Sequence, residues 1–300
     1  MMIKHNELFG DVSANYFDDR NKQLKIVLSR KGKTLLYNNQ PITKTSDFIG
    51  LLNVIIFEPS NINFFDESPG YRRKVFDMEI SKVSKKYVQA LNEYYHLLKE
   101  RNAYLKNELI DDNYLFVLNE KMIESQMIII SYRQEIVDII NQNISKIFSK
   151  LLNKQVSIRL VYHCCVDNSD IHMNLKKMYA QNKNRDIMFK VTNSGIHRED
   201  FGFFVNEYKL EDVASQGQKR LVMIALKLQL MNYIKIKTGK YAVLLLDDVL
   251  SELDYEKQGL LLSCIPDNIQ TIITAVNVDK RKIKRKCRVI EIANGKVKED

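Results

Sequence analysis

The sequence has no run of about 18 consecutive apolar residues, which is what a membrane-spanning helix requires. Residues 1–10 also lack the charged and then apolar layout of a secretory signal peptide. We therefore expect a protein that makes no membrane contact and resides in the cytoplasm. No internal repeat and no low-complexity linker divides the chain.

Cysteine is scarce, with four in 300 residues, too few for a disulfide framework in a chain of this length. Cys164 and Cys165 are adjacent, so the C-x-x-C spacing of zinc or redox motifs is missing. His163 precedes this pair and raises the alternative of a zinc site. Because residues 162–165 end an extended apolar run, we favour strand residues over metal ligands.

Acidic residues are outnumbered, with 37 Asp and Glu against 46 Lys and Arg, which gives a net charge of +9. This balance favours a polyanionic partner such as nucleic acid, although a soluble surface explains it equally well. The apolar content of 45% is enough to bury the core of one large domain or two ordinary ones.

Extended and helical patterns alternate along the first half of the chain. Alternating apolar residues predict a β-hairpin over residues 23–39 and a strand over residues 51–57, which Pro59 ends because it has no N–H to donate. After Pro69, apolar steps of three and four predict one long helix. A second helix after residues 111–113 should pack against it antiparallel. The apolar positions are Phe76, Ile80, Val83, Tyr87, Leu91, Tyr94, Leu98, Val137, Ile140, Ile144, Ile147 and Leu151.

The second half reads as short apolar strands followed by helices, a pattern that indicates a parallel sheet covered on both faces. A closing hairpin is predicted over residues 288–297, with Asn294 and Gly295 in its turn. The other predicted elements are strands at residues 156–161, 187–191, 201–205, 241–246 and 271–276, and helices at residues 215–237 and 255–263.

Two carboxylates follow an apolar strand. Residues 243–246 form a run that only a strand buried on both faces tolerates, so Asp247 and Asp248 lie at its carboxyl end, where open α/β sheets bind ligands. There the first carboxylate can hold Mg²⁺ and the second can orient or deprotonate an attacking water. An Asp-rich start of the next helix is the alternative interpretation.

The helix predicted from Ser215 begins with a possible anion site. Ser215 is a good N-cap, and the free N–H groups at the positive end of a helix bind anions. Gly217 leaves room for a phosphate, while Lys219 and Arg220 add positive charge. Alone, the segment is an ordinary capped helix; together with the carboxylate strand it predicts a nucleotide site.

The residues of both motifs, in their order, resemble those of the RecF family of bacterial recombination mediators. Generic ABC and SMC heads usually carry Glu where this chain has Asp248, so the resemblance is more specific than the superfamily. Residues 195–200, Arg72 with Arg73, and the strand at residues 53–59 are also similar, and the resemblance spans nearly the whole chain. The two motifs read Ser215-Gln216-Gly217-Gln218-Lys219-Arg220 and Asp247-Asp248-Val249-Leu250-Ser251-Glu252-Leu253-Asp254.

The resemblance implies an α/β fold: an ABC-type ATPase head, with a mixed and parallel sheet and flanking helices, and an inserted short helical arm domain. The head is expected at residues 1–72 and 179–300, and the inserted, mainly helical domain at residues 73–178. SMC-type proteins insert much longer coiled coils at this point.

The resemblance also implies residue roles. Asp247 is the expected Mg²⁺ ligand and Asp248 the expected catalytic base. His197 and Arg198 lie in a matched motif, and their role stays open between structure and contact. The residues expected to contact a nucleotide held by the opposite subunit are Ser215, Gln216, Gly217, Gln218 and Arg220, and those expected in the D-loop that crosses the dimer are Ser251 and Asp254.

The family's function is then expected here: ATP binding, ATP-dependent dimerisation and binding of single-stranded or gapped DNA. With recombination mediator proteins, such a dimer promotes recombinase loading in recombinational repair, DNA replication and the SOS response to DNA damage. A basic cluster is a candidate for contact with DNA phosphates, although a solvated loop is the alternative. Its members are Lys280, Arg281, Lys282, Lys284, Arg285 and Lys286.

A phosphate loop of the form Gly-x-x-x-x-Gly-Lys-Ser/Thr is missing from the 300 residues. The Gly-Lys-Thr at residues 32–34 has Val27 in place of the first glycine and lies in the predicted hairpin. Because the family begins with a strand, this loop and a helix, we expect the chain to start after them and to hydrolyse ATP poorly or not at all. A truncated, non-catalytic DNA-binding or interaction module is therefore the alternative function. A nucleotide kinase fits the sequence less well, because kinases lack both the signature helix, which begins here at Ser215, and the D-loop.

Overall fold

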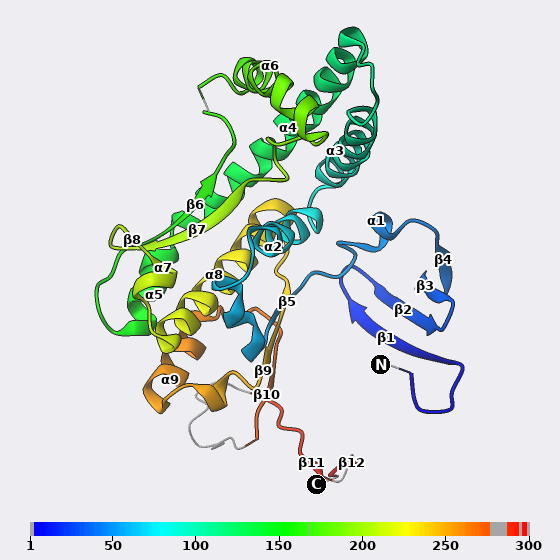
Figure 1. Ribbon diagram of the computed structural model, residues 1–300. Helices are drawn as coiled ribbons and strands as arrows, with labels where there is room; N and C mark the ends of the chain where they lie inside the picture. Colours follow the sequence, from blue (N-terminus) through cyan, green and yellow to red (C-terminus); the bar gives the residue numbers. More distant parts are fainter. Residues whose placement is uncertain (1–2, 168, 277–286, 294–295, 299–300) are drawn as a thin grey trace.

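The computed structural model describes residues 3–167, 169–276, 287–293 and 296–298. The chain combines a small antiparallel sheet, a lobe of long helices and a short parallel sheet (Figure 1). None of the described helices is both long enough and apolar enough to cross a bilayer.

The N-terminal sheet is antiparallel throughout, with the order β1-β2-β3-β4. The predicted hairpin over residues 23–39 is confirmed, since Leu24 pairs with Tyr37 across it. Residues 32–34 begin its second strand, directly after the turn at residues 30 and 31, so this Gly-Lys-Thr lies in a hairpin as expected and not between a strand and a helix. The strands are β1 (Phe9–Phe17), β2 (Asn21–Ser29), β3 (Gly32–Tyr37) and β4 (Gln40–Ile42).

The prediction of one long helix after Pro69 is wrong, because two helices share its apolar positions. The first, α2 (Pro69–Ser81), ends before Ser84, whose Oγ accepts a hydrogen bond from the Tyr87 N–H and so starts α3 (Lys85–Tyr104). Helical periodicity continued across this break and concealed it. The second predicted helix is likewise divided, into α4 (Asp112–Asn141) and α5 (Ile144–Leu152). The expected packing between the two helical segments is confirmed by the contact of α3 with α4.

The strand predicted at residues 187–191 is also wrong, because residues 187–189 form the last turn of α6 (Ile171–Phe189). Lys190 ends that helix in the left-handed conformation, with φ of 56°. A short apolar run does not distinguish a strand from a helix end. The expected inserted domain, residues 73–178, begins inside α2 and ends inside α6, and this division stays a proposal.

The predicted parallel sheet is confirmed, with the order β10-β9-β5. Its strands are β5 (Val54–Phe57), β9 (Val243–Asp247) and β10 (Thr271–Thr274). The expectation of two covered faces is not met within the described residues. Leu244 and Leu246 are buried, whereas Ile56 and Ile272, on the opposite face, are 44% and 51% exposed.

The remaining predicted elements are present with small shifts at their ends. The strand at residues 201–205 is β7 (Asp200–Val205), and it lies between β6 (Ile158–His163) and β8 (Tyr208–Lys209) in a third sheet. The other elements are α1 (Thr45–Phe48), η1 (Pro59–Phe65), α7 (Leu210–Val213), α8 (Gln216–Thr238), η2 (Leu250–Glu252), α9 (Tyr255–Cys264), β11 (Ile292–Ala293) and β12 (Lys296–Val297). The last two strands pair as the predicted closing hairpin, whose turn residues Asn294 and Gly295 lie outside the described residues.

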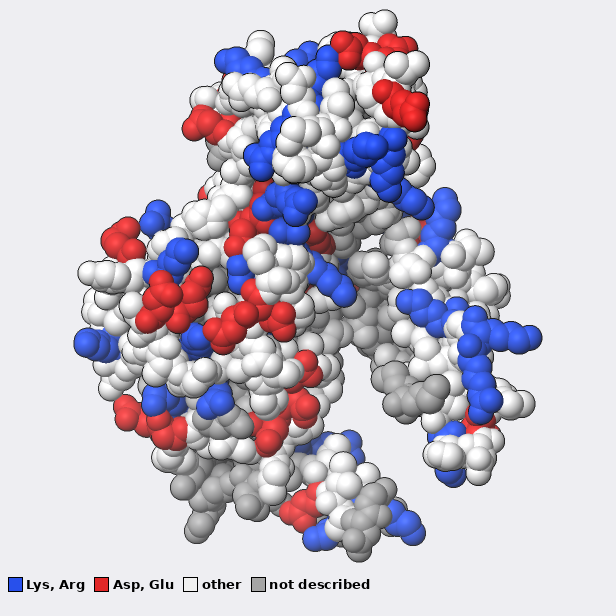
Figure 2. All heavy atoms as spheres, in the orientation of Figure 1, with Lys and Arg blue, Asp and Glu red and all other residues white. Residues whose placement is uncertain are grey.

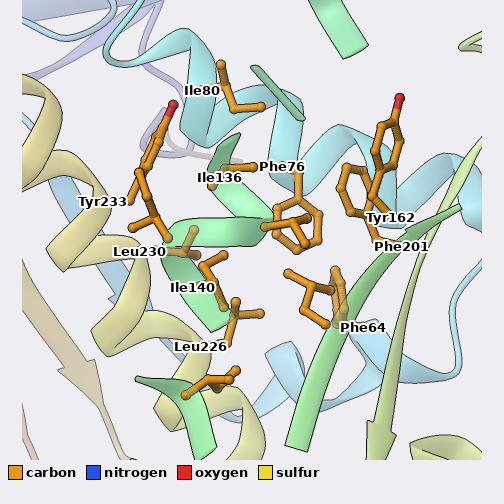
Figure 3. Packing of buried hydrophobic residues seen from close by; sticks show 14 of the residues in the cluster. Phe64, Phe76, Ile80, Ile136, Ile140, Tyr162, Phe201, Leu226, Leu230 and Tyr233 are labelled. Atoms are coloured by element: carbon orange, nitrogen blue, oxygen red, sulfur yellow. The ribbon is translucent and has the colours of Figure 1, made fainter. Parts of the chain in front are cut away.

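Helix α8 is the central element of the core, and it contacts α4, α5 and β5. Leu226 and Leu230 on α8 lie beside Ile136 and Ile140 on α4, with aromatic side chains farther along the same cluster (Figure 3). Because α8 is buried on nearly all sides, its position is fixed by packing with both the helical lobe and the parallel sheet.

A buried ion network joins three segments of the helical lobe. The Arg133 guanidinium on α4 is fully buried, and its Nη2 lies 2.9 Å from Asp77 Oδ1 on α2. Its Nη1 donates to Glu199 Oε2 at 2.8 Å and to the Ile196 carbonyl at 3.1 Å. Tyr87 Oη donates to the same Asp77 carboxylate at 2.5 Å. The network therefore fixes α2, α4 and the segment before β7 relative to one another.

The antiparallel sheet is separated from the helices by a hollow, visible between the two parts in Figure 2. Where the sheet approaches α2 and α3, a cavity of about 710 Å³ lies between them. Leu24 lines it from the sheet, Leu52 from the segment before β5, and Met78 and Tyr95 from α2 and α3.

Loss of the buried guanidinium should destabilise the fold strongly. We expect Arg133→Met to lower the free energy of unfolding by about 3–5 kcal/mol, because Asp77 and Glu199 lose their cationic partner in the interior. Urea denaturation measures this loss. Arg159→Met is the control, because the Arg159–Glu207 pair is exposed and should cost no more than about 1 kcal/mol. Equal losses of unfolding free energy in the two variants would contradict the stabilising role of the Arg133 network.

Candidate nucleotide site

Helix α8 begins with a complete capping box. Ser215 Oγ accepts from the Gln218 N–H at 3.3 Å, and Gln218 Oε1 accepts from the Ser215 N–H at 2.9 Å. Ser215, Gln216 and Gly217 are exposed, and a Cβ at Gly217 would make only an ordinary contact, 3.9 Å from Ser215 Oγ. The helix start therefore presents N–H groups to solvent, where an anion can reach them.

The positive charge expected beside this helix start is smaller than the sequence indicated. Lys219 is only 6% exposed, and its Nζ pairs with Asp66 Oδ1 at 2.7 Å. Its charge is thus neutralised within the molecule, while Arg220 is half-buried. The sequence did not indicate this, because Asp66 lies at the end of η1, far from Lys219 along the chain.

The two carboxylates at the end of β9 lie in different local environments. Asp247 is exposed, and its Oδ1 accepts from the Thr274 hydroxyl at 2.5 Å. Asp248 has a left-handed backbone, with φ of 52°, and its N–H donates to the Thr274 carbonyl at 3.2 Å. Its Oδ1 accepts from Ser251 Oγ at 2.5 Å. The left-handed residue turns the chain sharply, so the two carboxylates have different partners. Thr274 joins the two residues, because its hydroxyl also accepts from the Asp248 N–H at 3.1 Å.

Thr274 is a site residue to which sequence reasoning gave no role. It pairs with Asp247 in the parallel register of β10 with β9, so the carboxyl ends of both strands contribute to one cluster. Adjacent parallel strands that end in polar residues were the available signal, but the order of the strands was not known from the sequence.

The expected D-loop residues lie directly after this cluster. Ser251 is on η2 and reaches back to Asp248, while Asp254 is the N-cap of α9. Asp254 Oδ1 accepts from the Lys257 N–H at 3.0 Å, and the Lys257 ammonium also pairs with this carboxylate. These hydrogen bonds with Lys257 lower the pKa of Asp254. Asp254 therefore caps α9. The alternative of an Asp-rich helix start, made for Asp247 and Asp248, is not met, because both residues lie before this cap.

Both motifs lie on the same side of the parallel sheet. Phe57 at the end of β5 pairs with Leu246 at the end of β9, so these carboxyl ends are adjacent. The chain continues from β5 into η1, whose C-cap Asp66 holds Lys219 in the first turn of α8. The helix start is thereby tied to the edge of the sheet where Asp247 and Asp248 lie.

The motif at residues 195–200 has structural contacts. His197 Nδ1 lies 2.7 Å from Tyr94 Oη, and His197 Nε2 lies 3.0 Å from the Thr192 carbonyl. A Cβ on Gly195, whose φ is 135°, would lie 2.5 Å from Tyr94 Oη, so this position requires glycine. Arg198 is exposed.

The acidic members of this motif are anchored as well. Asp200 forms a two-point ion pair with Arg72, at 2.9 and 2.6 Å, and Arg73 donates to the Glu199 carbonyl. The matched arginines before Asp77 and the matched acidic residues therefore contact each other. The basic cluster at residues 280–286 lies outside the described residues.

Comparison with known proteins gives consistent relatives. No protein-family model matches the chain. It is 37% identical over 289 residues to a protein named DNA replication and repair protein RecF from Acholeplasma laidlawii, covering 94% of this chain and 80% of that protein. It is 34% identical over 280 residues to the protein of the same name from Streptococcus gordonii, covering 92% and 77%. A solved structure of the recombination mediator protein RecF with ATP, in the RecFOR pathway, superposes with a TM-score of 0.85 at 28% identity, covering 99% and 81%.

The half-buried His197 should make stability depend on pH. Burial lowers the pKa of His197, so the unfolded chain takes up a proton near the ordinary value of about 6.5 and the folded chain only at lower pH. The free energy of unfolding should then fall as pH drops below about 6.5, by at most about 1.4 kcal/mol per pH unit. Urea denaturation from pH 7 to 5 should give a shallower slope for His197→Gln than for wild type. The control is His96→Gln, whose side chain is 74% exposed, and equal slopes in both variants would refute the prediction.

Proposed function

Because the chain belongs to the RecF family, we propose that it acts in DNA replication and recombinational repair, by binding ATP and single-stranded or gapped DNA. The proposed active form is an ATP-dependent dimer that works with recombination mediator proteins to promote recombinase loading. The relatives named for DNA replication and repair and the RecF–ATP structure support this proposal.

The observation that carries the nucleotide part is the exposed start of α8 on the same side of the sheet as Asp247 and Asp248. An exposed helix start suits the terminal phosphate of a nucleotide held by another subunit, because its N–H groups have no intrahelical acceptors. In this arrangement the chain contributes to a shared site. The residues proposed to contact that phosphate are Ser215, Gln216, Gly217, Gln218 and Arg220.

The end of β9 offers suitable ligands for Mg²⁺. An exposed carboxylate and a hydroxyl, from Asp247 and Thr274, are hard oxygen donors of the kind that this ion prefers. When bound, Mg²⁺ would neutralise charge on the nucleotide phosphates. Asp248 is the proposed base that orients a water, and the hydrogen bond from Ser251 holds its carboxylate in place. Ser251 and Asp254 are the proposed D-loop contacts across the dimer.

A carboxylate introduced at the start of α8 tests phosphate binding separately from helix stability. Gly217→Asp should repel a phosphate and weaken nucleotide-dependent association at least about tenfold, which corresponds to about 1.4 kcal/mol. The same change should leave the fold intact or slightly more stable, because acidic residues favour the first turn of a helix. The measurement is sedimentation velocity of the chain mixed with the Acholeplasma laidlawii RecF protein, with a slowly hydrolysed ATP analogue and Mg²⁺.

Gly259→Asp is the matched control, since it adds the same side chain in open space on α9. It should associate as wild type does. Equal association of the two variants would refute the role of the α8 start. Association that never responds to nucleotide, with DNA binding retained, would instead favour a non-catalytic DNA-binding or interaction module.

The basic cluster is proposed to contact DNA phosphates. The variant K280A/R281A/K282A removes three of these charges. For single-stranded DNA, the slope of log Kobs against log salt concentration should become less steep by up to about two. The loss of affinity should be the same for every DNA sequence. Fluorescence anisotropy over a salt series measures this slope. The control variant, K121A/K146A/K154A, removes three exposed lysines from α4, α5 and the turn after it. An unchanged slope in the first variant would exclude the cluster as a DNA contact.

A further inference from the structure

Two adjacent thiols and a buried carboxylate meet at the end of β6. The Sγ atoms of Cys164 and Cys165 and a carboxylate oxygen of Glu199 all lie within 4.8 Å of one another. The antiparallel pairing of His163 with Asp200 causes this meeting, because it places the residues after β6 opposite the residue before β7. His163 is not a member of the group, although it directly precedes the thiols.

The two oxygens of Glu199 have separate partners. Oε2 accepts from Arg133 Nη1 at 2.8 Å and from the Tyr162 hydroxyl. Oε1 points to the other side, where it accepts from the Cys165 N–H at 3.0 Å and from Cys164 Sγ at 3.5 Å. A carboxylate ligand is commonly oriented in this way, with outer partners on one oxygen and the metal on the other.

The distances suit a tetrahedral zinc ion. With Zn–S near 2.3 Å and Zn–O near 2.0 Å, a tetrahedral site separates sulfur from oxygen by about 3.5 Å. Cys164 Sγ and Glu199 Oε1 already have this separation. Small rotations of the two cysteine side chains would bring all three ligand atoms to distances that suit zinc. Both cysteines are half-buried, which leaves a path for the ion from solvent.

The charges are also compatible. Glu199 shares the single positive charge of Arg133 with Asp77, so one cation faces two carboxylates before any ion binds. Zinc binding would release one proton from each thiol to solvent as each Zn–S bond forms. Two thiolates then cancel the charge of Zn²⁺, so the interior gains no net charge.

We propose that Cys164, Cys165 and Glu199 bind one Zn²⁺, with water as the fourth ligand. The ion would cross-link the end of β6 to the segment before β7, next to the Arg133 network that joins α2 and α4. The site is separate from the proposed nucleotide site, and its test does not depend on ATP or DNA.

Zinc content of the purified chain tests the proposal. After loading with Zn²⁺ and desalting, wild type should retain about one ion per chain by mass spectrometry, and C164S/C165S should retain less than about a tenth of that. C264S/C287S, which removes the two cysteines outside the group, should retain zinc as wild type does. Co²⁺ in place of Zn²⁺ should give thiolate-to-metal charge-transfer absorption in wild type and in C264S/C287S only.

A measurement on wild type alone guards against misfolding of the variants. Zn²⁺ should protect Cys164 and Cys165 from alkylation by iodoacetamide, while the exposed Cys287 stays reactive. Mass mapping of the alkylated peptides distinguishes these positions. The proposal is overturned by wild type that retains no zinc, by C164S/C165S that retains as much as wild type, or by unchanged alkylation of the pair.

Discussion

The fully buried guanidinium of Arg133 is the interaction on which the arrangement of the helical lobe depends. It binds Asp77 on α2 and Glu199 before β7, so it holds together segments more than fifty residues apart in the chain. Desolvating these charges costs several kcal/mol per ion, which their attraction offsets only when the geometry is complete. The network therefore specifies one arrangement of these segments more than it adds net stability. Because Glu199 also faces Cys164, the same network directs a carboxylate oxygen toward the two thiols.

Helix α8 connects the nucleotide motifs to the part of the fold that the Arg133 network holds together. That helix packs against α4 and against the parallel sheet, so its exposed start keeps a fixed relation to the carboxyl edge of β9. The ion pair of Lys219 with Asp66 reinforces the relation but removes a charge that the sequence offered to a phosphate. Phosphate binding by the N–H groups of a helix start does not need that charge.

Much of the local structure could be predicted from the sequence. The hairpin of β2 and β3, helix α8, and strands β9 and β10 follow from alternation, helical period and capping residues, all of which depend on near neighbours. The errors have two causes: a helical period does not show where a helix breaks, and a short apolar run does not distinguish a strand from a helix end. Ser84 begins a new helix within a continuous apolar pattern, and residues 187–189 end a helix instead of forming a strand.

By itself, the sequence determined the family, the two motifs and the order of most elements, because these depend on residue types and spacings along the chain. Only the tertiary structure decided which distant side chains meet. Strand pairing sets Thr274 beside Asp247 and Glu199 beside Cys164, while helix packing buries Lys219 against Asp66. Register and packing are properties of the whole chain, since each arises from many contacts between residues far apart in sequence.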